Sequence, residues 1–213
     1  GYNAGYSITT ATQNTALGGL ALDAITTGGQ NTAIGMAAGS AATTGDGGTY
    51  VGFNAGASVT TAALNTVVGS YAFDAATTAG ESVAIGYAAL TATTTGASNT
   101  AVGYASLSAN TTGANNTAVG KHSLDANTTA SDNTAFGHNA LKENTTGTRN
   151  VAVGALALDA NTTADANTAF GYNALGANTT GTNNVAIGYQ SLDANTTSSD
   201  NTAVGFNSLT NST

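Results

Sequence analysis

The hydrophobic and polar residues of this chain recur with a period of 17 residues. Glycine occupies every seventeenth position from Gly1 to Gly205, and an apolar residue precedes each glycine after the first. Paired threonines follow the same step, with Thr111–Thr112 and Thr128–Thr129 as two examples. No insertion interrupts the pattern, so the 213 residues hold twelve periods and nine further residues. A fixed period that covers a whole chain indicates a repeat architecture.

The order of residue types within one period predicts short strands separated by turns. The period is numbered here from its glycine, position 1, to the apolar residue before the next glycine, position 17. In residues 103–119, GYASLSANTTGANNTAV, β-branched residues at positions 15 and 17 flank an alanine, while Asn, Gly and Thr-Thr interrupt the remainder. No stretch between these interruptions is long enough for an ordinary helix. Small and β-branched residues between Asn/Gly clusters are typical of strands and turns instead.

We therefore predict an all-β protein, a parallel β-solenoid of 17-residue coils with about 12.5 coils. We expect one continuous array over residues 1–213, with less regular coils in 1–95 and highly regular Asn-Thr-Thr coils in 96–213. The chain starts on the glycine of one repeat and stops inside another, so we interpret it as a segment of a longer chain.

Two neighbouring strand positions suggest how the solenoid meets a partner. Position 17 is always apolar and position 16 is almost always Ala, and adjacent strand residues point to opposite faces. A single solenoid with one wet outer surface should carry polar residues in one of these columns. We expect the Ala-Gly column to face outward and to be covered by other copies, in an intertwined or side-by-side homo-oligomer. A homotrimer is the favoured state, and a filament is the alternative.

Four columns are expected to form structural ladders along the stack, through close backbone contact, apolar packing, hydroxyl hydrogen bonds and amide hydrogen bonds. These candidate ladder residues are Gly86, Gly103, Gly120 and Gly137; Val102 and Val119; Thr111, Thr112, Thr128 and Thr129; and Asn99, Asn116 and Asn133.

The threonine and asparagine columns each leave an alternative open. A regular threonine face on a β-solenoid suits ordered water, which makes an ice-binding protein the alternative of a different class. Adjacent threonines on a strand would face opposite sides, so only one per coil would point outward. Glycosylation is the alternative for asparagine, because Asn110, Asn115, Asn127, Asn144, Asn161, Asn178, Asn195 and Asn211 begin N-x-S/T sequons.

The composition disfavours several partners. Only 7% of the residues are charged, and the net charge of −8 leaves Lys121, Lys142 and Arg149 as the strong bases. We therefore expect no binding to nucleic acid or to an anionic membrane surface. No apolar run approaches the roughly 20 residues of a membrane span, so no membrane insertion is expected in this segment. Cysteine is absent, which excludes disulfides and thiolate metal sites.

The residue types give no support for catalysis, a metal or a cofactor. His122 and His138 are isolated substitutions, and the aspartates at position 6 stand two or three coils apart. We therefore predict that the chain is not an enzyme. The aromatic residues at position 2 are the candidate ligand-facing groups, and they could instead shield a groove between chains. These aromatic candidates are Tyr87, Tyr104, Tyr172 and Tyr189.

Three stretches resemble a known family: ESVAIGYAA (81–89), NTAVGYASL (99–107) and NVAIGYQSL (184–192). They look like the head repeats of trimeric autotransporter adhesins, a resemblance that implies a left-handed parallel β-roll in a trimer. The repeat with Asn-Thr-Thr-Gly is also similar to phage tail-fibre shafts. The 17-residue period departs from the shorter repeat of the adhesin heads.

The resemblance implies an extracellular structural or adhesive fibre on a cell surface or virion. Such a stiff shaft or head would present binding sites for a host-surface glycan or receptor. A bacteriophage tail-fibre shaft for host attachment is the alternative within this class.

Overall fold

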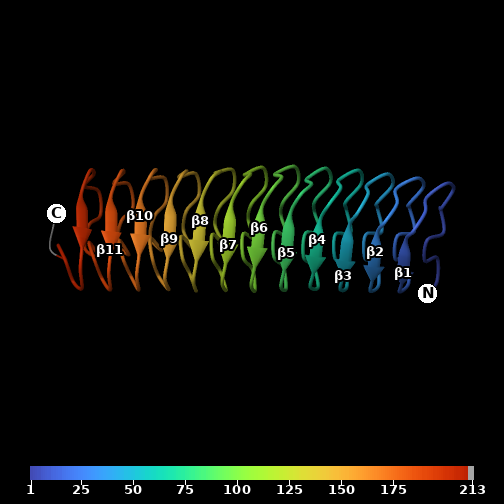
Figure 1. The fold of residues 1–213 in the computed structure, drawn as a ribbon, viewed down its shortest axis with the longest axis horizontal. Helices are drawn as coiled ribbons and strands as arrows, with labels where there is room; N and C mark the ends of the chain where they lie inside the picture. The colour runs from blue at the N-terminus through green and yellow to red at the C-terminus, as the bar shows by residue number, and fades with distance from the viewer. Residues whose placement is uncertain (211–213) are drawn as a thin grey trace. The chain divides into compact units, whose positions relative to one another are not determined.

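The computed structural model describes residues 1–210 and divides the chain into two compact units. The first unit is Gly1–Ala105, and the second begins at Ser106. Each unit contains six strands of three residues, which follow one another in chain order in Figure 1. No helix occurs in residues 1–210.

The strands of the first unit are β1 (Thr15–Leu17), β2 (Thr32–Ile34), β3 (Thr49–Val51), β4 (Thr66–Val68), β5 (Val83–Ile85) and β6 (Thr100–Val102). Those of the second are β7 (Thr117–Val119), β8 (Thr134–Phe136), β9 (Val151–Val153), β10 (Thr168–Phe170), β11 (Val185–Ile187) and β12 (Thr202–Val204).

Within each unit the strands pair in parallel with a register of one period. Thr15 lies opposite Thr32 in the first unit, and Val185 lies opposite Thr202 in the second. Backbone hydrogen bonds repeat with the same step, as in the 2.8 Å bond that the Gly137 N–H donates to the Val119 carbonyl oxygen. The predicted parallel β-solenoid of 17-residue coils is therefore confirmed for each unit.

Position 1 requires glycine because the chain turns a corner there directly against the next coil. Gly52 has a φ of +139°, which L-amino acids with a side chain rarely adopt. A Cβ atom on Gly52 would lie 2.6 Å from the carbonyl oxygen of Gly69, the same position one coil later. The glycine column thus permits both the corner conformation and the close approach of successive coils.

The wall that follows this corner contains residues other than glycine in the left-handed region. Leu124 and Leu141, at position 5, have φ values of 50° and 51° and are fully buried. A left-handed residue with a side chain costs about 1–2 kcal/mol, and burying a leucine side chain contributes a similar or larger amount. The leucine column therefore offsets the conformational cost of the wall that it covers.

The structure corrects the predicted orientation of the strand columns. Alanine at position 16 points inward and is inaccessible to solvent, as at Ala84 and Ala118. The apolar residue at position 17 points outward, and Ile85 and Ile187 are 37% and 40% exposed. Because the coil is narrow, the buried position-5 leucines fill its interior and leave room only for a small side chain on the strand. The expected outward Ala-Gly column is wrong.

The first unit accommodates a large inward side chain by a group of local substitutions. Tyr50 takes the place of the usual alanine at position 16 and is 1% exposed. Glycine replaces the usual large residue at three neighbouring positions, Gly39, Gly48 and Gly56. A Cβ atom would lie 2.9 Å from the Tyr50 ring at Gly39 and 2.5 Å from it at Gly48. These irregular coils therefore keep the 17-residue backbone path, because the glycines around Tyr50 compensate for the larger volume of its side chain.

Replacing the corner glycine Gly52 by alanine should strongly destabilise the fold. The forbidden φ and the overlap with the Gly69 carbonyl together should cost about 3 kcal/mol or more. The measurement is the free energy of unfolding in urea. Gly19→Ala is the matched control, because a Cβ atom there would have its nearest contact at 3.9 Å. Equal effects of the two substitutions would contradict the proposed requirement at position 1.

Alkaline pH should destabilise the first unit through Tyr50. Burial raises the pKa of the Tyr50 hydroxyl from 10.0 to about 12, and a hydrogen bond with Asn65 offsets part of that rise. Because the pKa is higher in the folded state, this contribution to stability is complete below pH 10. It should fall by about 1.4 kcal/mol per pH unit between pH 10 and pH 12.

The test compares urea unfolding of the wild type and of Tyr50→Phe across that range. The difference in unfolding free energy between the two proteins should shift with pH by this slope. A difference that stays constant from pH 8 to pH 12 would contradict the assignment.

Candidate functional site

The paired threonines lie in a bend and not in a strand, so the expected alternation across a strand is wrong for them. The first threonine is half-buried, and its hydroxyl donates to the main chain of the next coil. Thr111 Oγ1 donates to the Thr128 carbonyl oxygen at 3.0 Å, and Thr128 Oγ1 donates to the Thr145 carbonyl oxygen at 3.3 Å. The second threonine of the pair, as at Thr112 and Thr129, is exposed. One threonine per coil therefore binds the stack, and the other faces solvent in single file.

Position 8, directly before the threonine pair, points inward. In the first unit it holds apolar residues such as Ile25 and Val59, which are fully buried. In the second unit it holds a buried asparagine ladder. Asn144 Nδ2 donates to Asn127 Oδ1 at 3.1 Å, and Asn161 Nδ2 donates to Asn144 Oδ1 at 2.8 Å. Each amide oxygen inside the stack accepts from the next coil, as a buried polar group requires, and only the buried Oδ1 of Asn195, the last asparagine of the ladder within residues 1–210, has no hydrogen-bond partner.

Position 14 forms a second asparagine ladder, which links side chains to the backbone. Asn116 Oδ1 accepts from the backbone N–H of Asn133 at 3.0 Å, and Asn133 Nδ2 donates to the Gly147 carbonyl oxygen at 2.8 Å. Asn99, Asn116 and Asn133 are all fully buried. This ladder ties the start of each strand to the coils on both sides of it.

The two ladders limit the glycosylation alternative. Six of the sequon asparagines occupy position 8 and are fully buried, so a glycan on any of them is incompatible with this fold. Those six are Asn110, Asn127, Asn144, Asn161, Asn178 and Asn195. Asn115 is exposed, and Asn211 lies outside the described residues.

The outward side of the strands forms an unusual surface, which we call the strand face. It consists of the residues at positions 15 and 17 of each strand. Position 15 is Thr nine times and Val three times, and position 17 is always Val, Ile, Leu or Phe. Phe136 and Phe170 are 51% and 56% exposed there. In each unit the strand face is therefore a partly to fully exposed surface of β-branched and apolar side chains.

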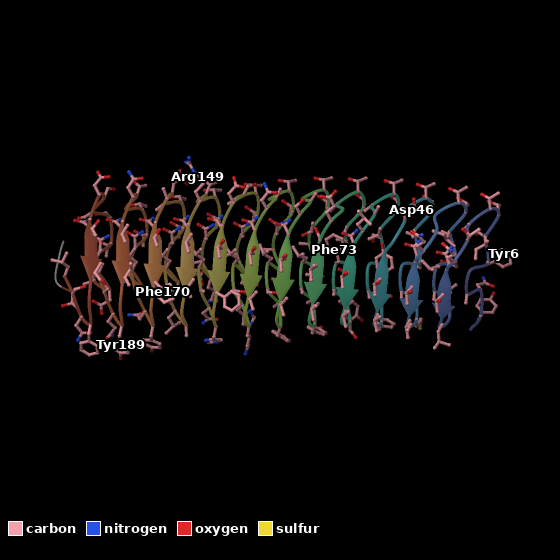
Figure 2. All side chains as sticks on the ribbon, viewed as in Figure 1. Tyr6, Asp46, Phe73, Arg149, Phe170 and Tyr189 are labelled. Carbon is pink, nitrogen blue, oxygen red and sulfur yellow. The ribbon has the colours of Figure 1, made fainter. Side chains whose placement is uncertain are left out.

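Charge is excluded from the strand face of both units. Thirteen of the fourteen charged residues, eleven acidic and three basic in total, occupy positions 6, 7, 12 or 13. Lys121, at position 2, is the exception. In Figure 2 Arg149 and Tyr189 of the second unit lie at opposite edges of the coils, with Phe170 on the strands between. Exposed apolar surface without charge is a mark of an interaction site.

A line of large side chains, which we call the ridge, flanks the strand face at the glycine corner. It contains the large residue at position 2, or at position 3 where position 2 is small. In the first unit it comprises Tyr2, Leu20, Met36, Phe53, Tyr71, Tyr87 and Tyr104; in the second, Lys121, His138, Leu156, Tyr172, Tyr189 and Phe206.

Positions 2 and 3 compensate for one another, a relation that the sequence analysis missed. The three coils with a small residue at position 2 are those of Gly19, Ser70 and Ala155. They carry Leu20, Tyr71 and Leu156 at position 3, where the other coils have Asn, Gln, Ala or His. Comparison of the two columns together would have revealed it. Every coil thus presents at least one large side chain at this corner.

The predicted ligand-facing aromatic residues all belong to the ridge, where many of the rings stack. Tyr87 and Tyr104 have centroids 5.4 Å apart and planes 13° apart, and Tyr172 and Tyr189 have values of 5.3 Å and 15°. Tyr71 joins the row from position 3, with its centroid 5.2 Å from that of Phe53. The planes of Tyr71 and Phe53 are 75° apart, an edge-to-face contact, whereas ring faces within the stacked pairs cover one another, so those pairs present ring edges to solvent. This arrangement suits lateral packing against another chain better than stacking of sugars on ring faces.

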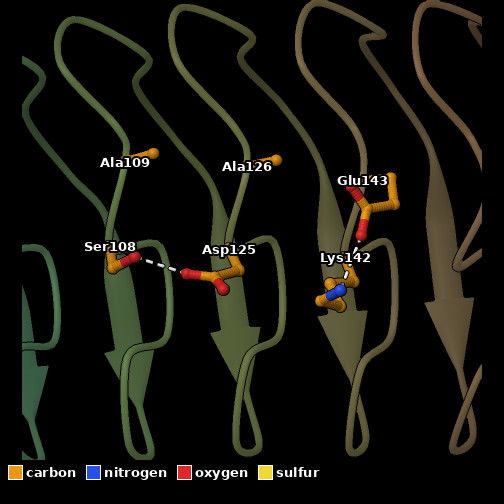
Figure 3. A pocket seen from close by; sticks show the side chains of 6 residues that line it. All are labelled: Ser108, Ala109, Asp125, Ala126, Lys142 and Glu143. Carbon is orange, nitrogen blue, oxygen red and sulfur yellow. Dashed lines mark hydrogen bonds and ion pairs between the residues drawn. The ribbon is translucent and has the colours of Figure 1, made fainter.

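A shallow depression of about 300 Å³ lies on the second unit away from the strand face, as Figure 3 shows. It is lined by Ser108, Ala109, Asp125, Ala126, Lys142 and Glu143. Asp125 accepts a hydrogen bond from Ser108 and contacts His122 Nδ1 at 2.9 Å. Lys142 Nζ contacts Glu143 Oε1 at 2.6 Å, and this hydrogen bond raises the pKa of Lys142. The polar groups are thus engaged with one another.

The remaining candidates for chemistry stay dispersed. His138 is exposed at the ridge, and Asp125 and Asp159 are separated by the coil of Lys142. Burial raises the pKa of Asp159, with no second carboxylate at its own position in the adjacent coils. Among residues 1–210, no group of three or more His, Cys, Asp or Glu side chains is arranged to hold a metal ion. Within the same residues, no helix has the length and hydrophobicity to cross a membrane.

Comparison with protein-family models, curated proteins and solved structures returns no match.

Interruption of the asparagine ladder should destabilise the second unit. Asn144→Ala would leave Asn127 Oδ1 without its donor and remove one acceptor of Asn161 Nδ2. Unpaired buried polar groups should lower the free energy of unfolding by about 2–4 kcal/mol. Thr146→Ala, at an exposed position of the same coil, should change it by less than about 0.5 kcal/mol. A small effect of Asn144→Ala in urea unfolding would refute a structural role for the ladder.

Proposed function

We propose that this chain is a structural and adhesive segment of an extracellular fibre, in which copies of the chain associate through their strand faces. The observation that carries the proposal is the exposed, charge-free strand face. A soluble chain gains nothing from exposing Val, Ile and Phe in every coil of a unit. Covering them with the same surface of other copies removes apolar area from water without burying any charge.

The homotrimer predicted from the sequence is the favoured assembly. Closed rotational symmetry allows each copy to contribute the same surface and leaves none of it exposed. A filament formed by end-to-end stacking is the alternative assembly. Both provide a stiff element, because backbone and side-chain ladders repeat in every coil of each unit.

The proposed task is mechanical and presentational, and it requires no catalytic group in this segment. The fibre would display binding positions for a host-surface glycan or receptor, on a cell surface or a virion. An adhesin head or shaft is the leading interpretation because of the resemblance of the repeats. A phage tail-fibre shaft for host attachment has the same physical basis.

Ice binding is a second candidate, supported by one specific observation. The exposed threonines at position 10, such as Thr112 and Thr129, recur in every coil. They stand in single file, because positions 8 and 11 on either side are buried in the regular coils. Thermal hysteresis and ice-recrystallisation assays of the wild-type chain separate this function from the fibre. Activity in a persistent monomer would favour ice binding.

The mass of the assembly, measured by light scattering over a dilution series, tests the proposed self-association. The wild type should have a stable multiple of the chain mass, and Ile187→Lys should dissociate. A lysine forced into the apolar contact should weaken assembly by about 100-fold or more. Because Ile187 is 40% exposed in the single chain, the variant should still fold.

Asn183→Lys is the matched control, because this exposed residue at position 13 lies outside the strand face. It should assemble as the wild type does. A wild type that remains monomeric at every concentration would refute self-association through the strand face.

A further inference from the structure

We infer that the ridge is a second contact line of the self-association interface, occupied by another copy of the same chain. The inference rests on the proposed function and extends it, because the strand face alone is sufficient for that proposal. It assigns a binding role to side chains that lie around the corner from the strands, at positions 2 and 3.

The compensation between positions 2 and 3 is the first argument. Tyr71 replaces the missing large residue at Ser70 and restores contact along the row, with ring centroids 5.2 Å from Phe53 and 6.0 Å from Tyr87. Leu20 and Leu156 stand in the same place beside Gly19 and Ala155. Packing of the chain's own core cannot require this, because ridge side chains such as Tyr87 and Tyr104 are about half exposed. We therefore attribute the uninterrupted ridge to a contact with another molecule.

The second argument is continuity with the strand face. Only the corner glycine separates position 17 from position 2, so each coil presents an apolar strand residue and a ridge residue in succession. Six coils at about 4.8 Å spacing give each unit a surface roughly 29 Å long. With the strand face and ridge together roughly 15 Å wide, each unit supplies roughly 440 Å², about half of the roughly 800 Å² per partner of a standard interface.

The third argument identifies the occupant as a second copy. A partner that contacts every coil must repeat along its own length with the coil spacing, and another stack of the same coils meets that condition. The net charge of −8 would oppose the approach of two copies elsewhere on the surface. The strand face and the first-unit ridge contain no charged side chain, so self-contact there buries none. In the second unit the ridge carries Lys121 and His138, which places no acidic group against an acidic neighbour.

The ridge is tested at Tyr71 by comparing a single with a double substitution in the full chain. Tyr71→Asn opens a gap in the row and should weaken assembly by at least 10-fold in the dilution series. The double variant Ser70→Tyr with Tyr71→Asn returns the ring to position 2, where most coils carry it, and should assemble within about twofold of the wild type. Leu64→Asn is the control, because Leu64 is 63% exposed at position 13, outside the ridge.

Far-UV circular dichroism and urea unfolding at equal concentration establish that each variant is folded. Tyr71→Asn that assembles like the wild type would overturn the inference. The inference would also be overturned if the double variant assembled as weakly as Tyr71→Asn. Assembly would then not depend on a large side chain in this coil of the ridge. If Ile187→Lys dissociates while Tyr71→Asn does not, the strand-face contact stands and the ridge contact is refuted. A wild type that remains monomeric would refute both the strand-face contact and the ridge contact.

Discussion

The rest of the structure depends on the direct contact between one corner glycine and the same glycine of the next coil. The backbones approach so closely there that no Cβ atom fits, and the φ of these residues is one that side chains disfavour. With this corner fixed, every coil of a unit must have the same length, and each residue lies against its equivalent 17 residues away. The ladders of threonine, asparagine and leucine all follow from that alignment, because like side chains are placed one above another.

The alignment of equivalent residues in successive coils also explains why the interior can be partly polar. An asparagine in an ordinary core needs partners from different elements, whereas here the amide of one coil donates to the amide of the previous one. The first unit fills the same position with Ile, Val, Ala or Thr. Asparagine and the residues of the first unit fit the same coil at position 8, because the glycine corner and the strand register determine the backbone path. Interior side chains can therefore vary as long as their combined volume is kept, as the glycines around Tyr50 demonstrate.

The distribution of charge is the link between this fold and the proposed function. Charged side chains gather at positions away from the strands, while the strand face holds uncharged Thr, Val, Ile, Leu and Phe and the ridge is kept filled. The strand face does not help the single chain, since it leaves apolar atoms in water, and the ridge helps it only through contacts between neighbouring rings. Both help an assembly of copies, in which stacked coils of identical spacing meet with no charge on the strand face and with Lys121 as the one strong base of the ridge. The physical properties of a fibre component thus reside in the exposed residues, and the coil supplies their regular spacing.

The sequence by itself determined the period, the parallel β-solenoid and the need for glycine at position 1, because each depends only on residues that recur at a fixed step. It also located the aromatic residues of the ridge, such as Tyr87 and Tyr189. It did not determine which apolar column enters the core. Val102 and Ala101 are both apolar and point opposite ways, and hydrophobicity alone favours burying the larger one.

Only the tertiary structure decided that the alanine is inside, because the opposite wall already fills the narrow coil with leucine. It also showed that the asparagines of position 8 point inward. Which side chains point into the coil depends on the distance between its opposite walls. A periodic sequence pattern does not specify that distance.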